Sequence, residues 1–504
     1  MADPMNQPGF NLVECPWIPV AETGGLVRLA SLRELLVHPS EFSGVATTVP
    51  TEFFALHRLL LAVCHRAIGP GTPAQRETLL DNWPAEMIQG YLERWAHRFD
   101  LFDEVRPFMQ VQALRSVEKL ETKPWTQLAL DRSSGNAKLL FDHSLDESAG
   151  VVAPAQAARL LVAHLQFTPG GLVKALRTSG TRGPACAIQV VLPLGKSLQE
   201  TLALGLVPQV QSEYAHDLPA WEADPPAIET LKAPPALVAK GPAQRYSWLT
   251  RAVLLRPDAS GQVPGALYAE GLNLSEDPVP DPMATMVPGK ESPHPAYLDV
   301  ERAFWRDLSA LAGEGGGSPP RVISNAVAMR AARDDYSPLE LAAGGLLPDQ
   351  AKILHWRLEE RRVSPALLTP GSVVAGRLDA AIERAREVSL TLYGAMMDLC
   401  REWISLGSDR KPTDGDVKAL VRELNGLARY WAELELRFWT FADRLGRGDP
   451  PDECLSAWYQ DIRATTLNCW NVATALLGDD ARALAAQAKA SSRLKLAIAK
   501  ASKT

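Results

Sequence analysis

A carboxylate, an amide and a small side chain stand together at Asp349, Gln350 and Ala351, directly after Pro348. The preceding apolar stretch is expected to end at the pair Gly344-Gly345. Proline fixes φ at the entrance of a turn, and glycine permits backbone paths that other residues resist. The sequence therefore predicts a polar turn that can contact the edges of base pairs or insert between stacked bases. It holds too few titratable groups to be a catalytic site.

A simpler interpretation of this turn is a helix cap. Aspartate is a favoured N-cap residue, and Pro348–Ala351 would then cap a helix that begins near Lys352. The residues alone leave both interpretations open.

No other spacing in the chain points to catalysis or to metal binding. The six cysteines include no Cys-x-x-Cys pair, which is typical of buried free thiols in a reducing compartment. Cys64 and His65 are adjacent, but neighbours on a helix point about 100° apart, which disfavours a catalytic dyad. The glycines at 315–317 lack the Lys-Ser/Thr pair of a phosphate-binding loop. We therefore expect no catalytic residue, no bound metal and no cofactor.

The composition is that of an ordinary globular protein. A chain of 504 residues predicts two or three domains, and 46% hydrophobic with 22% charged residues is an average balance. No apolar run approaches the roughly 20 residues that span a bilayer. The first residues resemble no signal peptide, since they have neither a basic region nor an apolar core. We expect a cytoplasmic protein without membrane contacts.

The net charge of −7 argues against a protein that coats nucleic acid by itself, because such binding depends on neutralising phosphates. It leaves room for a local basic surface. Residues 488–504 carry basic side chains and no acidic one, and the candidate contacts with a DNA strand are Lys489, Arg493, Lys495 and Lys500. The alternative is that this run is only a solvated helix face.

Apolar periodicity divides the chain into two parts. The first part is expected to hold helices over residues 52–68 and 154–166 and a strand over 186–192, joined by connectors rich in proline and glycine. From residue 372 onwards, apolar residues recur every three or four positions and predict four helices, the second of which runs unbroken over 413–445. The expected fold is an α+β N-terminal domain over 1–369 and a C-terminal four-helix bundle over 370–504.

Three stretches carry a resemblance to a known family. They are Phe-Asn-Leu-Val-Glu-Cys-Pro-Trp-Ile-Pro-Val at 10–20, Pro-Phe-Met-Gln at 107–110, and Ser-Pro-Leu-Glu-Leu with the later Gly-Gly, Gln-Ala-Lys-Ile-Leu and Arg-Arg at 337–362. In this order they resemble the CasA-type large subunit of the type I-E CRISPR surveillance complex, Cascade. The resemblance spans nearly the whole chain, although only these stretches are specific.

The resemblance implies a function. A subunit of this family is non-catalytic and reads the protospacer-adjacent motif (PAM) of double-stranded target DNA through the minor groove. It helps to open the duplex and start the R-loop, and it recruits a helicase-nuclease in antiviral defence. The implied partners are the target DNA, the guide RNA (crRNA), the other Cascade subunits and that helicase-nuclease. Guide pairing, not this subunit, reads the target sequence itself.

The resemblance also implies roles for particular residues. Gln350 matches a glutamine that wedges into the duplex, with Asp349 and Ala351 beside it. Gly170, within Pro169–Gly171, matches a glycine loop that lies against the minor groove. The family's lysine finger has no counterpart, since residues 267–282 contain no lysine. Residues 130–144 correspond to a loop that orders against the guide RNA.

Two other classes of function stay open at this point. One is an enzyme with a cofactor pocket in the N-terminal domain and an oligomerising bundle, which metal analysis and a nuclease assay would reveal. The other is a scaffold between protein subunits, which motif-dependent DNA binding would exclude.

Overall fold

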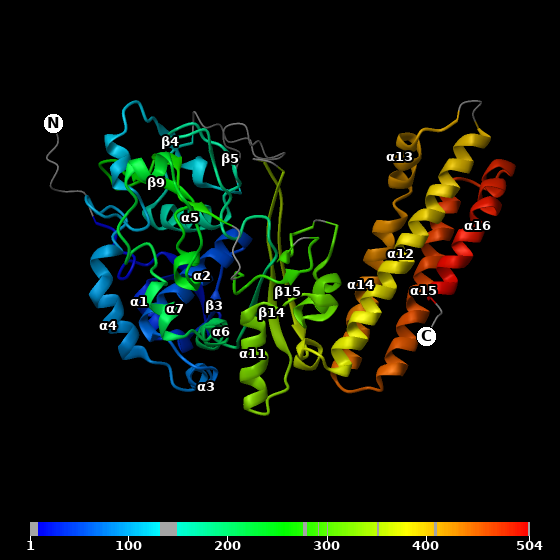
Figure 1. Ribbon diagram of the computed structural model, residues 1–504, viewed down its shortest axis with the longest axis horizontal. Helices are drawn as coiled ribbons and strands as arrows, with labels where there is room; N and C mark the ends of the chain where they lie inside the picture. The colour runs from blue at the N-terminus through cyan, green and yellow to red at the C-terminus, as the bar shows by residue number, and fades with distance from the viewer. Residues whose placement is uncertain are drawn as a thin grey trace. The chain divides into compact units, whose positions relative to one another are not determined.

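The computed structural model describes residues 9–131, 149–275, 280–290, 292–299, 301–349, 352–407 and 411–501, and leaves out the side chains of 349 and 352–354 (Figure 1). The chain forms two compact units. Unit 1 comprises Met1–Val300, Pro319–Asp335 and Leu339–Arg362, and unit 2 comprises Glu301–Ser318, Tyr336–Pro338 and Val363–Thr504.

Unit 1 mixes short helices with small sheets. Its helices are α1 (Leu32–Val37), α2 (Pro50–Ile68), α3 (Pro73–Glu77), α4 (Ala85–Trp95), α5 (Pro154–Phe167), α6 (Leu198–Gly205), α7 (Gln211–His216), α8 (Ile228–Lys232), α9 (Pro242–Tyr246) and α11 (Arg321–Ala332). The predicted helices over 52–68 and 154–166 are confirmed as α2 and α5.

Most strands of unit 1 are short. They are β1 (Ile18–Glu22), β2 (Val27–Ala30), β3 (Phe42–Val45), β4 (Thr122–Pro124), β5 (Gly171–Leu172), β6 (Ser179–Gly180), β7 (Val190–Leu194), β8 (Ala236–Leu237), β9 (Arg251–Arg256), β10 (Gly265–Glu270), β11 (Asn273–Leu274), β12 (Met286–Val287), β13 (His294–Pro295), β14 (Leu339–Asp349) and β15 (Lys352–Val363). Three sheets have three strands each, in the orders β2-β1-β3, β4-β10-β9 and β15-β14-β7. The strand expected over 186–192 starts later, at Val190, because Ala187 adopts a φ of 69° that interrupts an extended chain.

Helix α2 forms the centre of unit 1. Every residue from Phe53 to Arg66 is buried, as in a helix surrounded by protein on all sides. Arg58 within it is fully buried and pairs with Asp281 at 2.7 Å. It also donates to Gln166 of α5 at 2.8 Å and lies over the ring of Tyr246 of α9 at 4.2 Å. The buried guanidinium of Arg58 thus links α2 to three other segments that are distant in the sequence.

Unit 2 is helical. Its helices are α10 (Leu308–Leu311), α12 (Val373–Leu406), α13 (Asp414–Leu424), α14 (Gly426–Gly446), α15 (Pro451–Leu476) and α16 (Ala481–Ala501). The expected single helix over 413–445 is wrong, because Asn425 takes a left-handed φ of 51° that separates α13 from α14. Asparagine tolerates this conformation better than most residues do. The described residues from 373 onwards therefore form five helices where four were expected.

An aromatic cluster holds unit 2 together. Trp305 stacks on Phe438 with ring centroids 4.4 Å apart and meets the edge of Trp458 at 6.2 Å. The adjacent Arg306 lies 3.7 Å from the ring centre of Trp431. These contacts explain why Glu301–Ser318, which the sequence places in the first domain, belongs to unit 2.

No helix in the described part of the chain is long and apolar enough to cross a membrane.

Candidate nucleic-acid interface

Strands β14 and β15 form a long hairpin at the motif that opened the sequence analysis (Figure 1). Strand β14 also pairs antiparallel with β7, from Glu340 opposite Leu194 to Gly344 opposite Val190. The expectation that the apolar element ends at Gly344-Gly345 is wrong, since the strand continues to Asp349. The helix-cap interpretation is also wrong, because a strand begins at Lys352.

The two glycines allow the close packing of this hairpin. A Cβ atom on Gly344 would collide with the backbone oxygen of Arg357 on β15. A Cβ atom on Gly345, whose φ is 150°, would lie 2.6 Å from the oxygen of Ile188. Glycine is therefore required here by close approach of neighbouring backbones.

The end of the hairpin carries the candidate wedge. Asp349 is the last residue of β14, and its side chain is not described. Gln350 and Ala351 lie outside the described residues, as does most of the loop over 130–144. In the sequence, they stand between the last residue of β14 and the first residue of β15.

Gly170 lies in a tight loop directly after α5. Gly171 and Leu172 of β5 pair with Gly180 and Ser179 of β6. A Cβ atom on Gly170 would lie 3.2 Å from the amide nitrogen of Arg182, so packing alone already favours glycine at this position. The loop is half-buried at Gly170 and exposed at Leu172.

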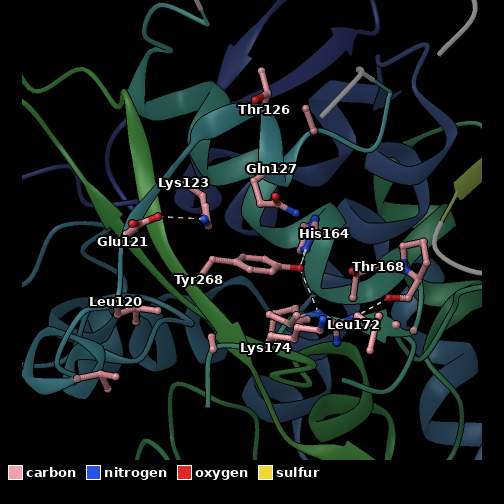
Figure 2. Close-up of a pocket in the computed structure, with 18 of the residues that line it drawn as sticks. Leu120, Glu121, Lys123, Thr126, Gln127, His164, Thr168, Leu172, Lys174 and Tyr268 are labelled. Carbon is pink, nitrogen blue, oxygen red and sulfur yellow. Dashed lines mark hydrogen bonds and ion pairs between the residues drawn. The ribbon is translucent and has the colours of Figure 1, made fainter. Parts of the chain in front are cut away.

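A buried polar cluster supports this loop from below. Arg251 of β9 donates to the oxygens of Pro169 at 2.6 Å and Thr181 at 2.7 Å, and its Nε donates to the Tyr268 hydroxyl at 3.1 Å. The same hydroxyl lies 2.9 Å from Nε2 of His164 (Figure 2). Burial, and then the charge of Arg251, lower the pKa of His164 to about 3, so its ring is neutral at pH 7. The cluster fixes the path of the loop backbone.

One segment connects the glycine loop to the hairpin. Gly183 donates to the oxygen of Thr168 at 2.8 Å, and Ala187 donates to the oxygen of Leu346 at 3.0 Å. The four-residue step from Gly183 to Ala187 spans at most about 14 Å. Gly170 and strand β14 therefore belong to one hydrogen-bonded framework, although some 180 residues separate them in sequence.

The four basic candidates all lie on α16 and differ in their surroundings. Lys489 pairs with Glu402 at 2.7 Å, and Arg493 pairs with Asp398 at 3.1 Å. Lys500 is half-buried and donates to Thr391 at 3.1 Å. Lys495 is exposed and forms no ion pair with any residue that the structure describes. Lys495 is thus the candidate best placed for an outside anion.

One basic residue was missed in the sequence. Lys290 is exposed in the chain between β12 and β13, which pair antiparallel. The residues that flank these two strands contact the chain at β7, since Val191 donates to the oxygen of Met283 and Gln189 donates to the oxygen of Ala296, each at 2.9 Å. Lys290 lies eight residues beyond the segment 267–282, which corresponds to the family's lysine finger. The preceding Pro288-Gly289, a typical turn signal, would have marked it.

Titratable groups in the core show the effects of burial. Burial lowers the pKa of His57 to about 4 and raises that of Cys186 to about 12, where nearby arginines only partly offset it. Among the residues that the structure describes, no cluster of three or more His, Cys, Asp or Glu side chains is placed to hold a metal ion.

Comparison with known proteins places the chain among the CRISPR-associated proteins. The model of the family described as CRISPR-associated protein Cse1 matches residues 11–469. The chain belongs to this Cse1 (CasA) family of large subunits.

Relatives of known identity match this chain over almost its full length. A CasA/Cse1 protein of Thermus thermophilus is 33% identical over 95% of this chain and 95% of its own. A solved structure of Thermus thermophilus CasA is 30% identical, with a TM-score of 0.83 over 97% of this chain and 99% of its own. A structure of Thermobifida fusca Cse1 is 25% identical, with a TM-score of 0.78 over 98% of this chain and 99% of its own.

Proposed function

We propose that this protein is the non-catalytic large subunit of a crRNA-guided type I-E Cascade complex in the cytoplasm. It recognises the PAM of double-stranded target DNA through the minor groove, helps to open the duplex, and recruits the helicase-nuclease. Its membership of the Cse1 family supports this proposal. A chain in a solved CRISPR RNA-guided surveillance complex has a similar fold, with a TM-score of 0.78 and 24% identity over 97% of this chain and 100% of its own. The crRNA and the other subunits are the proposed partners.

The observation that carries the proposal is the framework shared by the hairpin and the glycine loop. Two-stranded β-ribbons are established readers of DNA grooves. The minor groove distinguishes mainly A·T from G·C pairs, so a few polar groups beside small residues form a permissive reader. Gly170 and Ala351 lack the bulk that would keep a backbone away from the groove floor. Asp349 can accept a hydrogen bond from a guanine amino group and repels phosphate.

Gln350 is the proposed wedge. Minor-groove proteins commonly insert a side chain between base steps and unstack them. At the connection of two long strands, an inserted amide would replace stacking and hydrogen bonds lost by the first open pair. Strands β14 and β15, which flank Gln350 in the sequence, would carry it as part of a two-stranded ribbon.

We expect Gln350→Ala to slow strand opening more than initial duplex contact. In the assembled complex, permanganate reactivity of thymines beside the PAM should appear roughly tenfold more slowly, about 1.4 kcal/mol in barrier height. Duplex affinity before opening should change little. Gln211→Ala, an exposed glutamine on α7, is the control. Normal opening in the Gln350 variant would make the wedge assignment wrong.

The basic residues of α16 are proposed contacts for the displaced strand. Because Lys489 and Arg493 already have acidic partners, Lys495 should contribute most. We expect Lys495→Glu combined with Lys500→Glu to weaken target binding and reduce its salt dependence by about one phosphate contact per charge. Lys418→Glu on the exposed side of α13 is the control. Equal salt slopes for both variants and the unaltered complex would defeat this assignment.

A further inference from the structure

A pocket of about 390 Å³ lies beneath the glycine loop. It is bounded by residues 117–130, by the loop over 168–175, and by His164, Arg251 and Tyr268. In Figure 2, Gln127 and Lys123 lie on one side of Tyr268, and Lys174 and Leu172 lie on the other. The volume is within the range of sites that enclose small molecules, which starts at about 300 Å³.

The floor of this pocket is rigid and its chemistry is mixed. The Tyr268 hydroxyl is held between Arg251 and His164, which fixes the position of its oxygen. Ala129 and Leu130 add buried apolar surface. Gln127 is half-buried and has no hydrogen-bond partner among the residues that the structure describes. Its amide therefore presents a free donor and a free acceptor, the combination that reads the edge of a nucleobase.

The rim of the pocket is basic. Its exposed charged residues are three lysines and two acids, namely Lys119, Lys123, Lys174, Glu118 and Glu121, and the buried Arg251 adds a fourth cation in the floor. This excess of cations in the lining contrasts with the net charge of −7 for the whole chain. Glu270 pairs with Arg251 in the sheet and accepts hydrogen bonds from the amides of Ala175 and Leu176. Even if Glu270 is counted with the lining residues, the cations still outnumber the acids.

Two of these lysines have an unusual backbone. Lys119 has a φ of 60° and Lys174 a φ of 61°, a left-handed conformation that residues other than glycine rarely adopt. Such residues concentrate at functional sites, where the surrounding structure holds them in place. Both are exposed at the mouth of the same pocket and come from different segments. Both lysines bring a flexible ammonium group to the mouth of the pocket, and an ammonium group suits a phosphate.

We propose that this pocket binds one nucleotide, with its base beside Gln127 and Tyr268 and its phosphate between Lys119 and Lys174. The choice of a nucleotide rests on the proposed role in nucleic-acid recognition. The pocket lies under the loop that carries Gly170, so a nucleotide that leaves its stack near this loop would find a site close by. Extruded bases are bound by stacking on aromatic or apolar side chains and by hydrogen bonds to the base edge, and Tyr268 and Gln127 offer both contacts here.

The test is a titration of the full chain with nucleoside 5′-monophosphates, in which binding is measured by saturation-transfer NMR. The deoxy and ribo forms are compared, since the 2′-hydroxyl separates a DNA strand from an RNA strand. The corresponding nucleosides, which lack the phosphate, and inorganic phosphate, which lacks the base and sugar, are titrated in the same way. We expect saturable nucleotide binding at least about tenfold tighter than that of either part alone. A preference for either sugar supports the proposal and identifies the strand.

Three variants make the test specific. Gln127→Trp should abolish nucleotide binding by filling the pocket. Lys174→Gly keeps the left-handed backbone, removes the amine, and should weaken binding about three- to tenfold, most strongly at low salt. Lys240→Ala, an exposed lysine elsewhere in unit 1, should change nothing. If Gln127→Trp does not fold, as judged by thermal unfolding, Lys174→Gly alone decides.

The proposal is overturned if no nucleotide binds saturably, if Gln127→Trp or Lys174→Gly binds as the unaltered chain does, or if phosphate alone binds equally well. Motif-dependent duplex binding by the assembled complex is measured separately. If the complex binds duplexes in a motif-dependent way but the chain binds no nucleotide, the nucleotide-pocket proposal is wrong and the proposed function stands. If the chain binds nucleotides specifically but the complex shows no motif-dependent duplex binding, the proposed function is wrong instead.

Discussion

A complex that carries Gly170→Asp should bind its correct PAM duplex about tenfold more weakly than one that carries Gly170→Asn, a difference of about 1.4 kcal/mol. Both side chains must displace the Arg182 amide, from which a Cβ atom at this position would be 3.2 Å away. They therefore share the strain in the loop and differ in charge. If Gly170 lies against the minor groove, the added carboxylate faces phosphates and is repelled.

Equilibrium binding of duplexes with correct and altered motifs, measured at low and high salt, separates the effect of the added charge from the effect of strain in the loop. The penalty of aspartate relative to asparagine should shrink as salt rises, because screening reduces the repulsion. Gly90→Asp, on a glycine of α4 with open space beside it, controls for net charge. Equal affinities of the Asp and Asn variants would remove Gly170 from the interface, and its glycine would then be explained by packing alone.

Arg58→Met should destabilise unit 1 by about 3–5 kcal/mol, because it leaves Asp281 buried without its partner. The side chain of Arg58 is 0% exposed and that of Asp281 is 3% exposed, so water cannot replace the lost pairing. Differential scanning calorimetry should show an earlier transition. The double variant Arg58→Met/Asp281→Leu should recover a large part of the loss, since neither charge of this ion pair is left behind without the other. A single variant as stable as the unaltered chain would contradict this account.

The same pair predicts a pH dependence. Burial alone would raise the pKa of Asp281, but the charges of Arg58 and Arg245 outweigh it and hold the pKa below its ordinary value. A carboxyl with a lowered pKa stabilises the fold above the pKa of the unfolded state, near 3.9, and loses that contribution as the pH falls through the folded value. The stability gap between Arg58→Met and the unaltered chain should therefore be largest near neutral pH and narrow below about pH 4.

Much of the helical architecture could be predicted because its signals are local. The apolar pattern over 52–68 and the proline at 154 gave α2 and α5 almost to the residue. The division between α13 and α14 escaped notice, because the apolar pattern runs on through Asn425 and only the backbone breaks. Periodicity reports which faces are buried, not whether a helix is continuous.

The candidate site was harder to predict because its geometry depends on distant contacts. The pair Gly344-Gly345 has the sequence appearance of a terminator, yet it lies mid-strand because the backbones of Arg357 and Ile188 approach it. The acids that pair with Lys489 and Arg493 belong to α12, some 90 residues earlier. The pocket combines residues near 120, 170, 251 and 268, and no window of the sequence contains them together.

The central claim is that this chain gives the complex its recognition of a short DNA motif. The most direct measurement compares target binding by the assembled complex with and without this subunit, on duplexes that differ only in the PAM. The account predicts strong preference for the correct motif in the complete complex, and loss of that preference when the chain is omitted. A motif preference that survives the omission would contradict it.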